Sequence, residues 1–285
     1  KGSVFFPAGI YKVTSTINIP PRSGQTYNVS LRIYGEGTGG NGSANTVVNA
    51  ATGFTGTGVF KYNQGVIPIS VNEVNLEFDH IGVQGNYFVA NGIEIFCPIG
   101  VSIHDVTVGS CTGSCIKLTG GEGYSVNVKD VYIYGSDPNH VASPAVFGIE
   151  STARYAMFSR IVMDGSQTGI KLSGDNNIVL NCHLEGQATC IDLATTGGGL
   201  ARIMSCLLNA YGAGQTGWPA SSVAIKITGS GAGAGLRNFI GFNQIDANVG
   251  AASAGIYLDS AYQTQIFSNR VTGSVNGVYL TAAAA

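Results

Sequence analysis

Small and apolar residues recur along the chain in a fixed four-residue pattern. A small residue is followed by an apolar one, a variable one and a second apolar one, as in GIKL at 169–172 and CIDL at 190–193. The pattern occurs eight times, with its first apolar residue at 93, 116, 149, 170, 191, 225, 256 and 278. Neighbouring copies are 21–23 residues apart, except at three places where about ten extra residues are inserted. The spacing predicts a structural repeat of about 22 residues.

Short segments rich in β-formers lie between these copies, and each holds two pieces in which apolar and polar residues alternate. Examples are 157–166 (MFSRIVMDGS) and 177–187 (NIVLNCHLEGQ). Each repeat therefore predicts three short strands joined by turns, without helical periodicity. A unit this small cannot bury its own apolar face, whereas stacked repeats cover one another. We predict an all-β fold, a right-handed single-stranded parallel β-helix with three short strands per coil and about 10 coils.

The repeats predict one domain with three parts. Residues 1–60 are expected to form N-terminal capping or opening coils, residues 61–280 the body of the β-helix, and residues 281–285 a low-complexity tail. Composition agrees with a β-rich fold, because 42 of 285 residues are Gly and only 11% are charged, against about 25% charged in an ordinary soluble domain. A net charge of −2 offers no basic field, and no run of 18 apolar residues occurs. We therefore expect no nucleic-acid partner and no membrane insertion.

The opening residues carry a family resemblance. The segments 4–20 (VFFPAGIYKVTSTINIP) and 31–39 (LRIYGEGTG) resemble the first coils of the pectate-lyase-like β-helix superfamily, in particular its branch of bacteriophage tailspikes and secreted polysaccharidases. The repeated unit resembles the same superfamily over most of residues 60–280. The resemblance implies a polysaccharide partner, a homotrimer, and a location that is extracellular or on a virion surface. It does not choose an activity, because the superfamily contains lyases, hydrolases, epimerases and non-catalytic fibres.

Stacking predicts columns of equivalent residues, with neighbours about 4.8 Å apart. The variable residue of the repeated pattern points outward and forms a column of alternating charge that ends in two aromatics: Glu94, Lys117, Glu150, Lys171, Asp192, Lys226, Tyr257 and Tyr279. We interpret it as structural or as part of a subunit interface, with an ionic glycan-binding face as the alternative. A second column is expected at the turn between the first two strands: His80, Asp105, Asp130, Arg160, Cys182, Cys206, Asn243 and Asn269.

A third column is expected just before the small residue, Gly or Ala, that ends the last strand, and it holds Asp164, Glu185, Asn209 and Asp246. Carboxylates on adjacent coils suit glycosidases, whose two carboxyl groups lie about 5–9.5 Å apart. Apposed carboxylates also raise one pKa, as a general acid requires. We predict that Asp164 and Glu185 form the catalytic pair, assisted by His183 and Arg160. The alternative is that they are ordinary polar residues at strand ends.

Two of the insertions, 135–147 and 210–223, follow this column three coils apart. We expect them to project as two walls with the catalytic pair between them. Aromatic rings on such loops suit the flat faces of sugars. The substrate-binding residues predicted here are Trp218, Tyr211, Asn209, Asp137 and His140.

The predicted function is the binding and degradation of a polysaccharide, without a cofactor or metal. A uronate polysaccharide lyase is one alternative, in which Arg160 would neutralise the uronate and His183 or a bound Ca²⁺ would assist. The alternative from another class is a non-catalytic glycan-binding fibre or adhesin.

Overall fold

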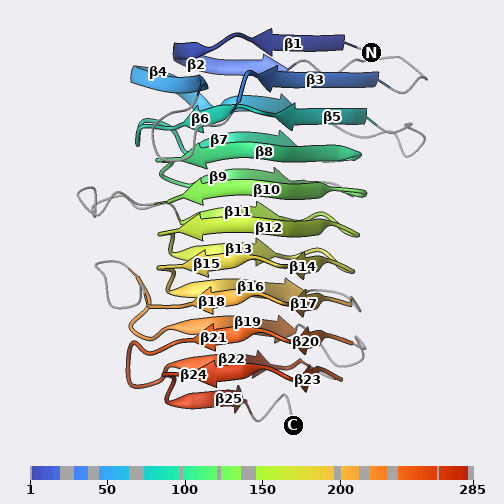
Figure 1. The fold of residues 1–285 in the computed structure, drawn as a ribbon, viewed down its shortest axis with the longest axis vertical. Helices are drawn as coiled ribbons and strands as arrows, with labels where there is room; N and C mark the ends of the chain where they lie inside the picture. Colours follow the sequence, from blue (N-terminus) through green and yellow to red (C-terminus); the bar gives the residue numbers. More distant parts are fainter. Residues whose placement is uncertain are drawn as a thin grey trace.

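The protein is a stack of parallel strands wound around one long axis, with its two ends at opposite ends of the stack (Figure 1). The computed structural model describes residues 2–19, 29–37, 45–63, 74–96, 99–120, 123–135, 146–195, 200–211, 218–229, 237–261 and 263–281. None of these residues is helical, so none lies in a helix that could cross a membrane. Each register between named strands is parallel. The predicted right-handed parallel β-helix is confirmed.

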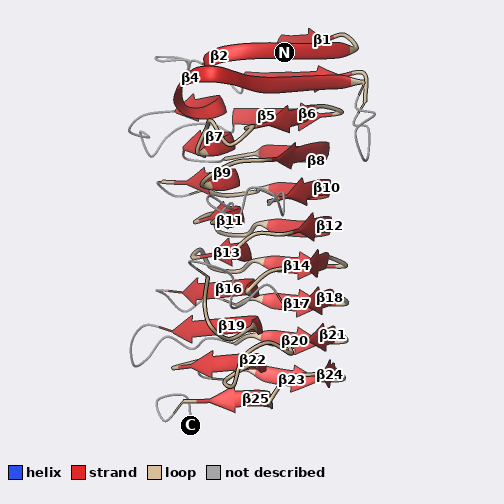
Figure 2. Cartoon of the chain, turned by 90° about the vertical axis from the view of Figure 1, so that its left-hand side faces the viewer, coloured by secondary structure: helices blue, strands red, loops and turns tan. Residues whose placement is uncertain are grey.

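The coils present three faces, and a second view shows the faces side by side (Figure 2). The first face consists of β1 (Gly2–Phe6), β3 (Val29–Gly35), β5 (Val74–Asp79), the first halves of β8 (Val101–Gly109), β10 (Asn127–Tyr134) and β12 (Met157–Asp164), then β14 (Ile178–Leu180), β17 (Arg202–Met204), β20 (Phe239–Gly241) and β23 (Gln265–Phe267).

The second face continues from the first around a bend. It consists of the start of β2 (Gly9–Ile19) and of β4 (Thr46–Asn63), β6 (Gly82–Gln84), the second halves of β8, β10 and β12, then β15 (His183–Glu185), β18 (Leu207–Asn209), β21 (Gln244–Asp246) and β24 (Arg270–Thr272). In β8, β10 and β12 one strand runs through the bend, where separate strands were predicted.

The third face carries the repeated sequence pattern. It consists of the ends of β2 and β4, then β7 (Asn91–Phe96), β9 (Ser114–Thr119), β11 (Phe147–Ser151), β13 (Thr168–Leu172), β16 (Thr189–Thr195), β19 (Val223–Gly229), β22 (Ala254–Asp259) and β25 (Asn276–Leu280). From β7 to β22 the first and last residues of the apolar-variable-apolar triplet point inward, and Ile116, Ile170 and Ile225 are fully buried. Val278 and Leu280 of β25, the last described strand of the stack, are exposed. One continuous apolar core therefore runs the length of the stack.

The predicted charge column of the third face is confirmed by register. Glu94 pairs with Lys117, Lys117 with Glu150, and the sequence of neighbours continues to Tyr257 and Tyr279. Lys61 lies next to Glu94 at 3.1 Å and extends the column by one coil. The two tyrosine rings stack with centroids 5.4 Å apart. Alternation of sign means that no like charges lie directly opposite each other here.

The bend between the first and second faces repeats a left-handed backbone conformation. Non-glycine residues adopt φ between 51° and 58° at His80, Asp105, Asp130, Arg160, Asn181, Ser205, Phe242 and Ser268. This conformation is sterically costly for such residues, and parallel pairing on both sides holds it. The turn column predicted from the sequence therefore combined two adjacent columns. Its last four members stand one residue after the left-handed residue of their coil: Cys182, Cys206, Asn243 and Asn269.

The asparagines of that following column join neighbouring coils. The Asn243 Nδ2 donates to the Ile203 carbonyl at 3.1 Å, and the Asn243 Oδ1 accepts from the Cys206 amide at 2.9 Å. Asn269 donates in the same way to the Ile240 carbonyl at 2.9 Å. Cys182 and Cys206 are buried free thiols. These amides supply partners for backbone groups at the bend, which the core would otherwise leave unpaired.

Two adjacent residues of β13 should differ sharply in their effect on stability. Ile170 is fully buried, so Ile170→Ala should lower the free energy of unfolding by about 2–5 kcal/mol. Lys171 lies outside in the charge column with its Nζ 4.6 Å from the centre of the Phe147 ring, so Lys171→Ala should cost less than about 1 kcal/mol. Urea unfolding followed by circular dichroism measures both, and equal losses would contradict the inward and outward assignment.

Candidate functional site

The second face brings the predicted carboxylates together. Asp164, the last residue of β12, is the register partner of Glu185, the last residue of β15. Glu185 is in turn the partner of Asn209, and Asn209 of Asp246. Because register neighbours on adjacent strands lie about 4.8 Å apart, the four side chains leave the same edge in one row. The predicted column is confirmed, and Asp164 and Glu185 are called the carboxylate pair below.

Glycines follow both members of the carboxylate pair and end their strands. Gly165 has φ of 60° and Gly186 has φ of 82°, a region that residues with a Cβ adopt at a cost. At Gly186 a Cβ would also lie 3.1 Å from the Asp164 Oδ1. These glycines let the chain turn sharply beneath the carboxylates without covering them.

The electrostatic surroundings of the carboxylate pair are unequal. Partial burial and the neighbouring Glu185 charge raise the pKa of Asp164, and His183 opposes part of that rise. The carboxylic acid form of Asp164 therefore persists to higher pH than that of an ordinary aspartate. A proton held next to an accepting carboxylate is the arrangement that acid catalysis requires.

Two further predicted residues face Glu185. The Tyr211 hydroxyl donates a hydrogen bond to the Glu185 Oε1, and Tyr211 itself is exposed. The His183 Nε2 lies 3.2 Å from the Glu185 Oε2, within ion-pair distance but not aligned for a hydrogen bond. Burial, the hydrogen bond to Glu185 and the charges of Glu185 and Asp164 raise the pKa of the Tyr211 phenol. Tyr211 therefore stays a neutral donor.

The two insertions begin at the same corner of the stack. Residue 135 follows Tyr134, residue 210 follows Asn209, and both of these residues belong to the row that contains the carboxylate pair. Three coil steps separate the two positions, which corresponds to about 14 Å. Asp137 and His140 lie outside the described residues, as do residues 136–145 and 212–217. Their predicted contacts with substrate stay predictions.

Trp218 is not the exposed sugar platform that the sequence analysis predicted. Its side chain is only 9% exposed and packs with Ala188 and Val249 in a small apolar cluster beside the main core. Its indole Nε1 is buried and donates to no group in the described part of the chain. Burial of the apolar indole ring against Ala188 and Val249 stabilises this position of Trp218.

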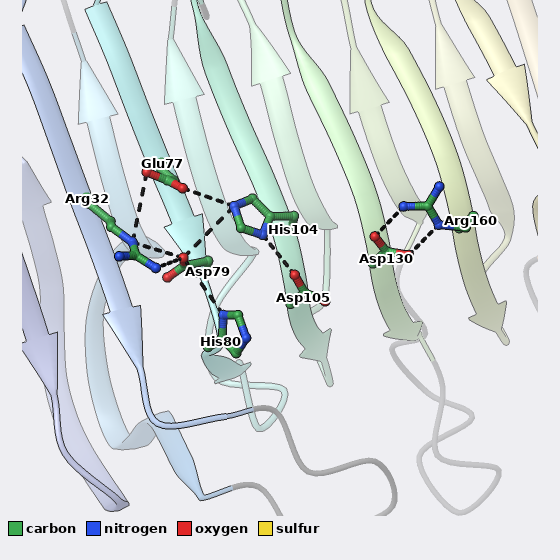
Figure 3. Close-up of polar contacts among 8 residues, drawn as sticks. All are labelled: Arg32, Glu77, Asp79, His80, His104, Asp105, Asp130 and Arg160. Carbon is green, nitrogen blue, oxygen red and sulfur yellow. Dashed lines mark hydrogen bonds and ion pairs between the residues drawn. The ribbon is translucent and has the colours of Figure 1, made fainter.

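Arg160 pairs with a carboxylate outside the carboxylate pair. It stands at the bend, where its Nε and Nη2 bind the Asp130 carboxylate at 2.5 and 2.6 Å (Figure 3). The Arg160 charge lowers the pKa of Asp130 chiefly through these hydrogen bonds. The two-pronged pairing with Asp130 engages the Arg160 guanidinium, and its predicted assistance to the carboxylate pair stays a prediction without support from these contacts.

Sequence reasoning missed two tyrosines next to the carboxylate pair. Tyr134 precedes Asp164 in the same row, and Tyr132 precedes Val162 in the outward row beside it. The rings are 6.0 Å apart, and the Tyr134 ring lies over Gly109, where a Cβ would approach it to 2.3 Å. The alternation VYIY at 131–134 could have revealed them, since both tyrosines fall at outward positions of a strand.

A charged cluster on the first face was also missed. Glu77 and Asp79 of β5 face His104 of β8, and Arg32 of β3 covers Asp79 (Figure 3). Among the described residues, Glu77, Asp79 and His104 form the one group of three side chains whose ligand atoms are close enough to hold a metal ion. Burial alone lowers the pKa of His104, but hydrogen bonds to Asp105 and Glu77 outweigh it and raise the pKa.

The raised pKa of Asp164 predicts that replacement of this side chain does not destabilise the fold at neutral pH. The folded state binds the Asp164 proton more tightly than the unfolded state does, so ionisation of Asp164 above its folded pKa destabilises the fold. Asp164→Asn should therefore leave the melting temperature at pH 7 unchanged or higher. The difference should vanish below about pH 3.9, the ordinary aspartate value.

Asp130→Asn is the control of opposite sign for that measurement. Arg160 lowers the pKa of Asp130, so its ionised form stabilises the fold above the ordinary aspartate value, and the stabilisation is lost as the pH falls through the folded pKa. Asp130→Asn should lower the melting temperature at pH 7 and not at low pH. Thermal melts from pH 3 to pH 8 measure both, and a loss at pH 7 in Asp164→Asn would count against the raised pKa.

Comparison with known proteins gives similarity of fold. No family model and no curated protein matches the chain. Among solved structures, the A-module of an Azotobacter vinelandii mannuronan C-5 epimerase has 15% identity and a TM-score of 0.45, over 99% of this chain and 88% of that one. The Streptococcus pneumoniae surface protein and adhesin PfbA has 10% identity and a TM-score of 0.48, over 98% and 91%.

The catalytic domain of a GH87 α-1,3-glucanase has 11% identity and a TM-score of 0.47, and the alignment covers 99% of this chain and 64% of that one. Identities this low mean that the chain is similar to these proteins in fold alone. Function has to be argued from the second face itself.

Proposed function

We propose that this chain binds a polysaccharide along its second face and cleaves glycosidic bonds there. The observation that carries the proposal is the register of Asp164 and Glu185, which sets two carboxylates on adjacent strands. Glycosidases of both stereochemical classes use two such groups on either side of the bond to be cut. The rigid ladder beneath them favours catalysis, since it holds both groups in place before substrate arrives.

The environment of each carboxylate suggests its role. Asp164, whose pKa is raised by burial and by Glu185, would protonate the departing glycosidic oxygen. Glu185, which faces the Tyr211 hydroxyl and the His183 imidazole, would act as the nucleophile or would activate water. Tyr211 and His183 are positioning residues in this scheme, because their contacts orient the Glu185 carboxylate.

The surface around the carboxylate pair suits a glycan chain that follows the axis of the stack. Tyr132 and Tyr134 lie on the N-terminal side of Asp164, and Asn209 and Asp246 lie on the C-terminal side of Glu185. Aromatic rings contribute flat apolar area, and amide and carboxylate groups hydrogen-bond sugar hydroxyls. Tyr132 and Tyr134 take over the stacking role that Trp218 cannot perform.

The alternative of a uronate lyase has less support from the described residues. A lyase needs a cation for the uronate, and Arg160 is engaged by Asp130. A non-catalytic fibre would use the same second face for binding without cleavage. A polysaccharide assay separates the three functions by what it detects, namely new reducing ends, an unsaturated product, or binding alone.

The carboxylate pair should be essential for cleavage and dispensable for folding. We expect Asp164→Asn and Glu185→Gln each to lower the rate of reducing-end release by at least about 100-fold, measured on a panel of bacterial capsular, cell-surface and plant polysaccharides. Tyr211→Phe should lower the rate less, since it removes only the hydrogen bond to Glu185. Lys171→Ala, on the third face, is the matched control and should retain full activity.

Affinity electrophoresis in gels that contain the same polysaccharides provides the second measurement. Tyr134→Ala should weaken retention, whereas Asp164→Asn should preserve it because stacking is intact. Retention of wild type without any product would overturn cleavage and leave the non-catalytic fibre. Full activity in both Asp164→Asn and Glu185→Gln would refute the carboxylate pair.

We also propose that the chain assembles as a homotrimer outside the cell or on a virion surface. Support comes from the exposed Tyr279 at the end of the charge column and from the location of polysaccharides outside cells. Light scattering should give a mass three times 29.3 kDa. A monomer across the micromolar range would refute the trimer and would leave the carboxylate pair untouched.

A further inference from the structure

The charged cluster on the first face carries an inference that is independent of glycan cleavage. We propose that Glu77, Asp79 and His104 bind a divalent cation of the Zn²⁺ class. The three residues come from β5 and β8, which are neighbouring strands in register from Leu76 to Asp79. They lie two to four coil steps from the carboxylate pair and on another face.

The distances between the ligand atoms of the cluster are close to those that ligands of one metal ion would have. The His104 Nε2 lies 3.1 Å from the Glu77 Oε1 and 3.9 Å from the Asp79 Oδ2, and all three ligand atoms fall within 4.8 Å of one another. Ligand bonds to Zn²⁺ are about 2.0–2.2 Å, so two ligand atoms on one ion stand at most about 4.4 Å apart. Rotamer shifts of a few tenths of an ångström would bring all three onto one ion.

Asp79 supplies an observation of its own. Its side chain is fully buried, and contacts from Arg32, His80 and His104 converge on its Oδ2 (Figure 3). Its Oδ1 is buried and accepts no hydrogen bond from any described residue. A buried carboxylate oxygen without a partner is strongly disfavoured. A cation bound by both oxygens of the Asp79 carboxylate would remove that penalty.

His104 is held as a metal-binding imidazole is held. Its Nδ1 lies 2.9 Å from the Asp105 Oδ2, and this contact directs the Nε2 toward Glu77 and Asp79. Metal-ligating histidines commonly donate their other ring nitrogen to a carboxylate, which orients the ring and increases its basicity. Asp105 can reach the ring because its backbone is left-handed, with φ of 52°.

Charge and ligand type select the class of cation. The carboxylates of Glu77, Asp79 and Asp105 outnumber Arg32, which contacts the first two of them (Figure 3). With neutral histidines these four side chains carry a net −2 (three negative charges and one positive), and Lys129 stands next to His104 on the following strand. The excess of negative charge attracts a dication. Ca²⁺ and Mg²⁺ favour oxygen ligands only, whereas an imidazole with carboxylates suits Zn²⁺ and its neighbours.

Arg32 and His80 leave the ligand set accessible. The Arg32 guanidinium approaches Asp79 from β3, and its side chain is 38% exposed, so it can remain on the solvent side of the carboxylate. The His80 Nδ1 lies 3.8 Å from the Asp79 Oδ2, and this side chain is half exposed. His80 stands at the rim, where a second imidazole could complete four-coordination.

The test is a titration of the full chain after treatment with a chelator. Isothermal titration calorimetry with ZnCl₂ should show one Zn²⁺ per chain, and the melting temperature should rise with Zn²⁺ and not with CaCl₂. His104→Gln and Glu77→Gln should abolish the binding. Asp105→Asn, which removes the group behind the imidazole, should weaken it by about 10–100-fold.

Control variants show whether the ion binds at this cluster or at another position. Asp130→Asn breaks a comparable carboxylate contact in the next coil but should bind Zn²⁺ like wild type. Binding of Co²⁺ should give visible absorption without a thiolate charge-transfer band, because the five cysteines of the described residues are buried. Glu77→Gln, at a partly exposed position, tests the site even if His104→Gln fails to fold.

Two results would overturn the proposal. Wild type that binds no Zn²⁺ at stoichiometric amounts would mean that the cluster is an ion-pair network alone. Undiminished binding in folded Glu77→Gln and Asp105→Asn would place the ion elsewhere. Neither result bears on the carboxylate pair, since Asp164→Asn should bind Zn²⁺ like wild type.

Discussion

Parallel pairing between coils is the constraint on which the rest of this structure depends. Each strand pairs with its equivalents one coil above and below, so every position of the repeat becomes a column along the axis. The pairing sets neighbours in a column about 4.8 Å apart. At that spacing the nearest side chains on the surface are the equivalent residues of the coils above and below. The residue types in each column therefore determine the charge and the contacts of each face.

Inward and outward columns contribute to stability in different ways. Inward positions such as Ile116, Ile170 and Ile225 form one continuous apolar core, which is the main source of stability in a stack of small repeats. Outward positions must avoid repeating a charge, and the third face does so by alternating Lys with Glu or Asp. The asparagines at the bend use the same spacing to bond backbone groups of the neighbouring coil.

The two candidate sites do not follow this rule that neighbouring charges alternate in sign. In the carboxylate pair, like charges are register neighbours, and this proximity contributes to the raised pKa of Asp164. Around His104, the carboxylates of Glu77, Asp79 and Asp105 gather, and the fully buried Asp79 has one oxygen unpaired among the described residues. Both arrangements cost stability, in contrast to the third face, where the charges alternate in sign. Sites that perform chemistry are where such local costs are expected.

The sequence alone determined the repeat, the strands and the columns that follow from them. The pattern at 169–172 and 190–193 aligned Lys171 with Asp192, and the glycines after Asp164 and Glu185 aligned the carboxylates. These inferences succeeded because a regular ladder converts sequence spacing directly into spatial neighbours.

Only the tertiary structure decided what lies beyond the repeat. Trp218 stands in an insertion whose path no period describes, so its burial against Ala188 and Val249 depends on packing. Arg160 bonds Asp130 because long side chains choose partners across columns as well as along them. His104 meets Asp79 because the bend fixes the register of FDH at 78–80 against IHD at 103–105. The position of that bend depends on a left-handed residue, and non-glycine residues of six types fill its eight described positions. No single residue type marks it in the sequence, because stacking on both sides supplies the energy that holds it.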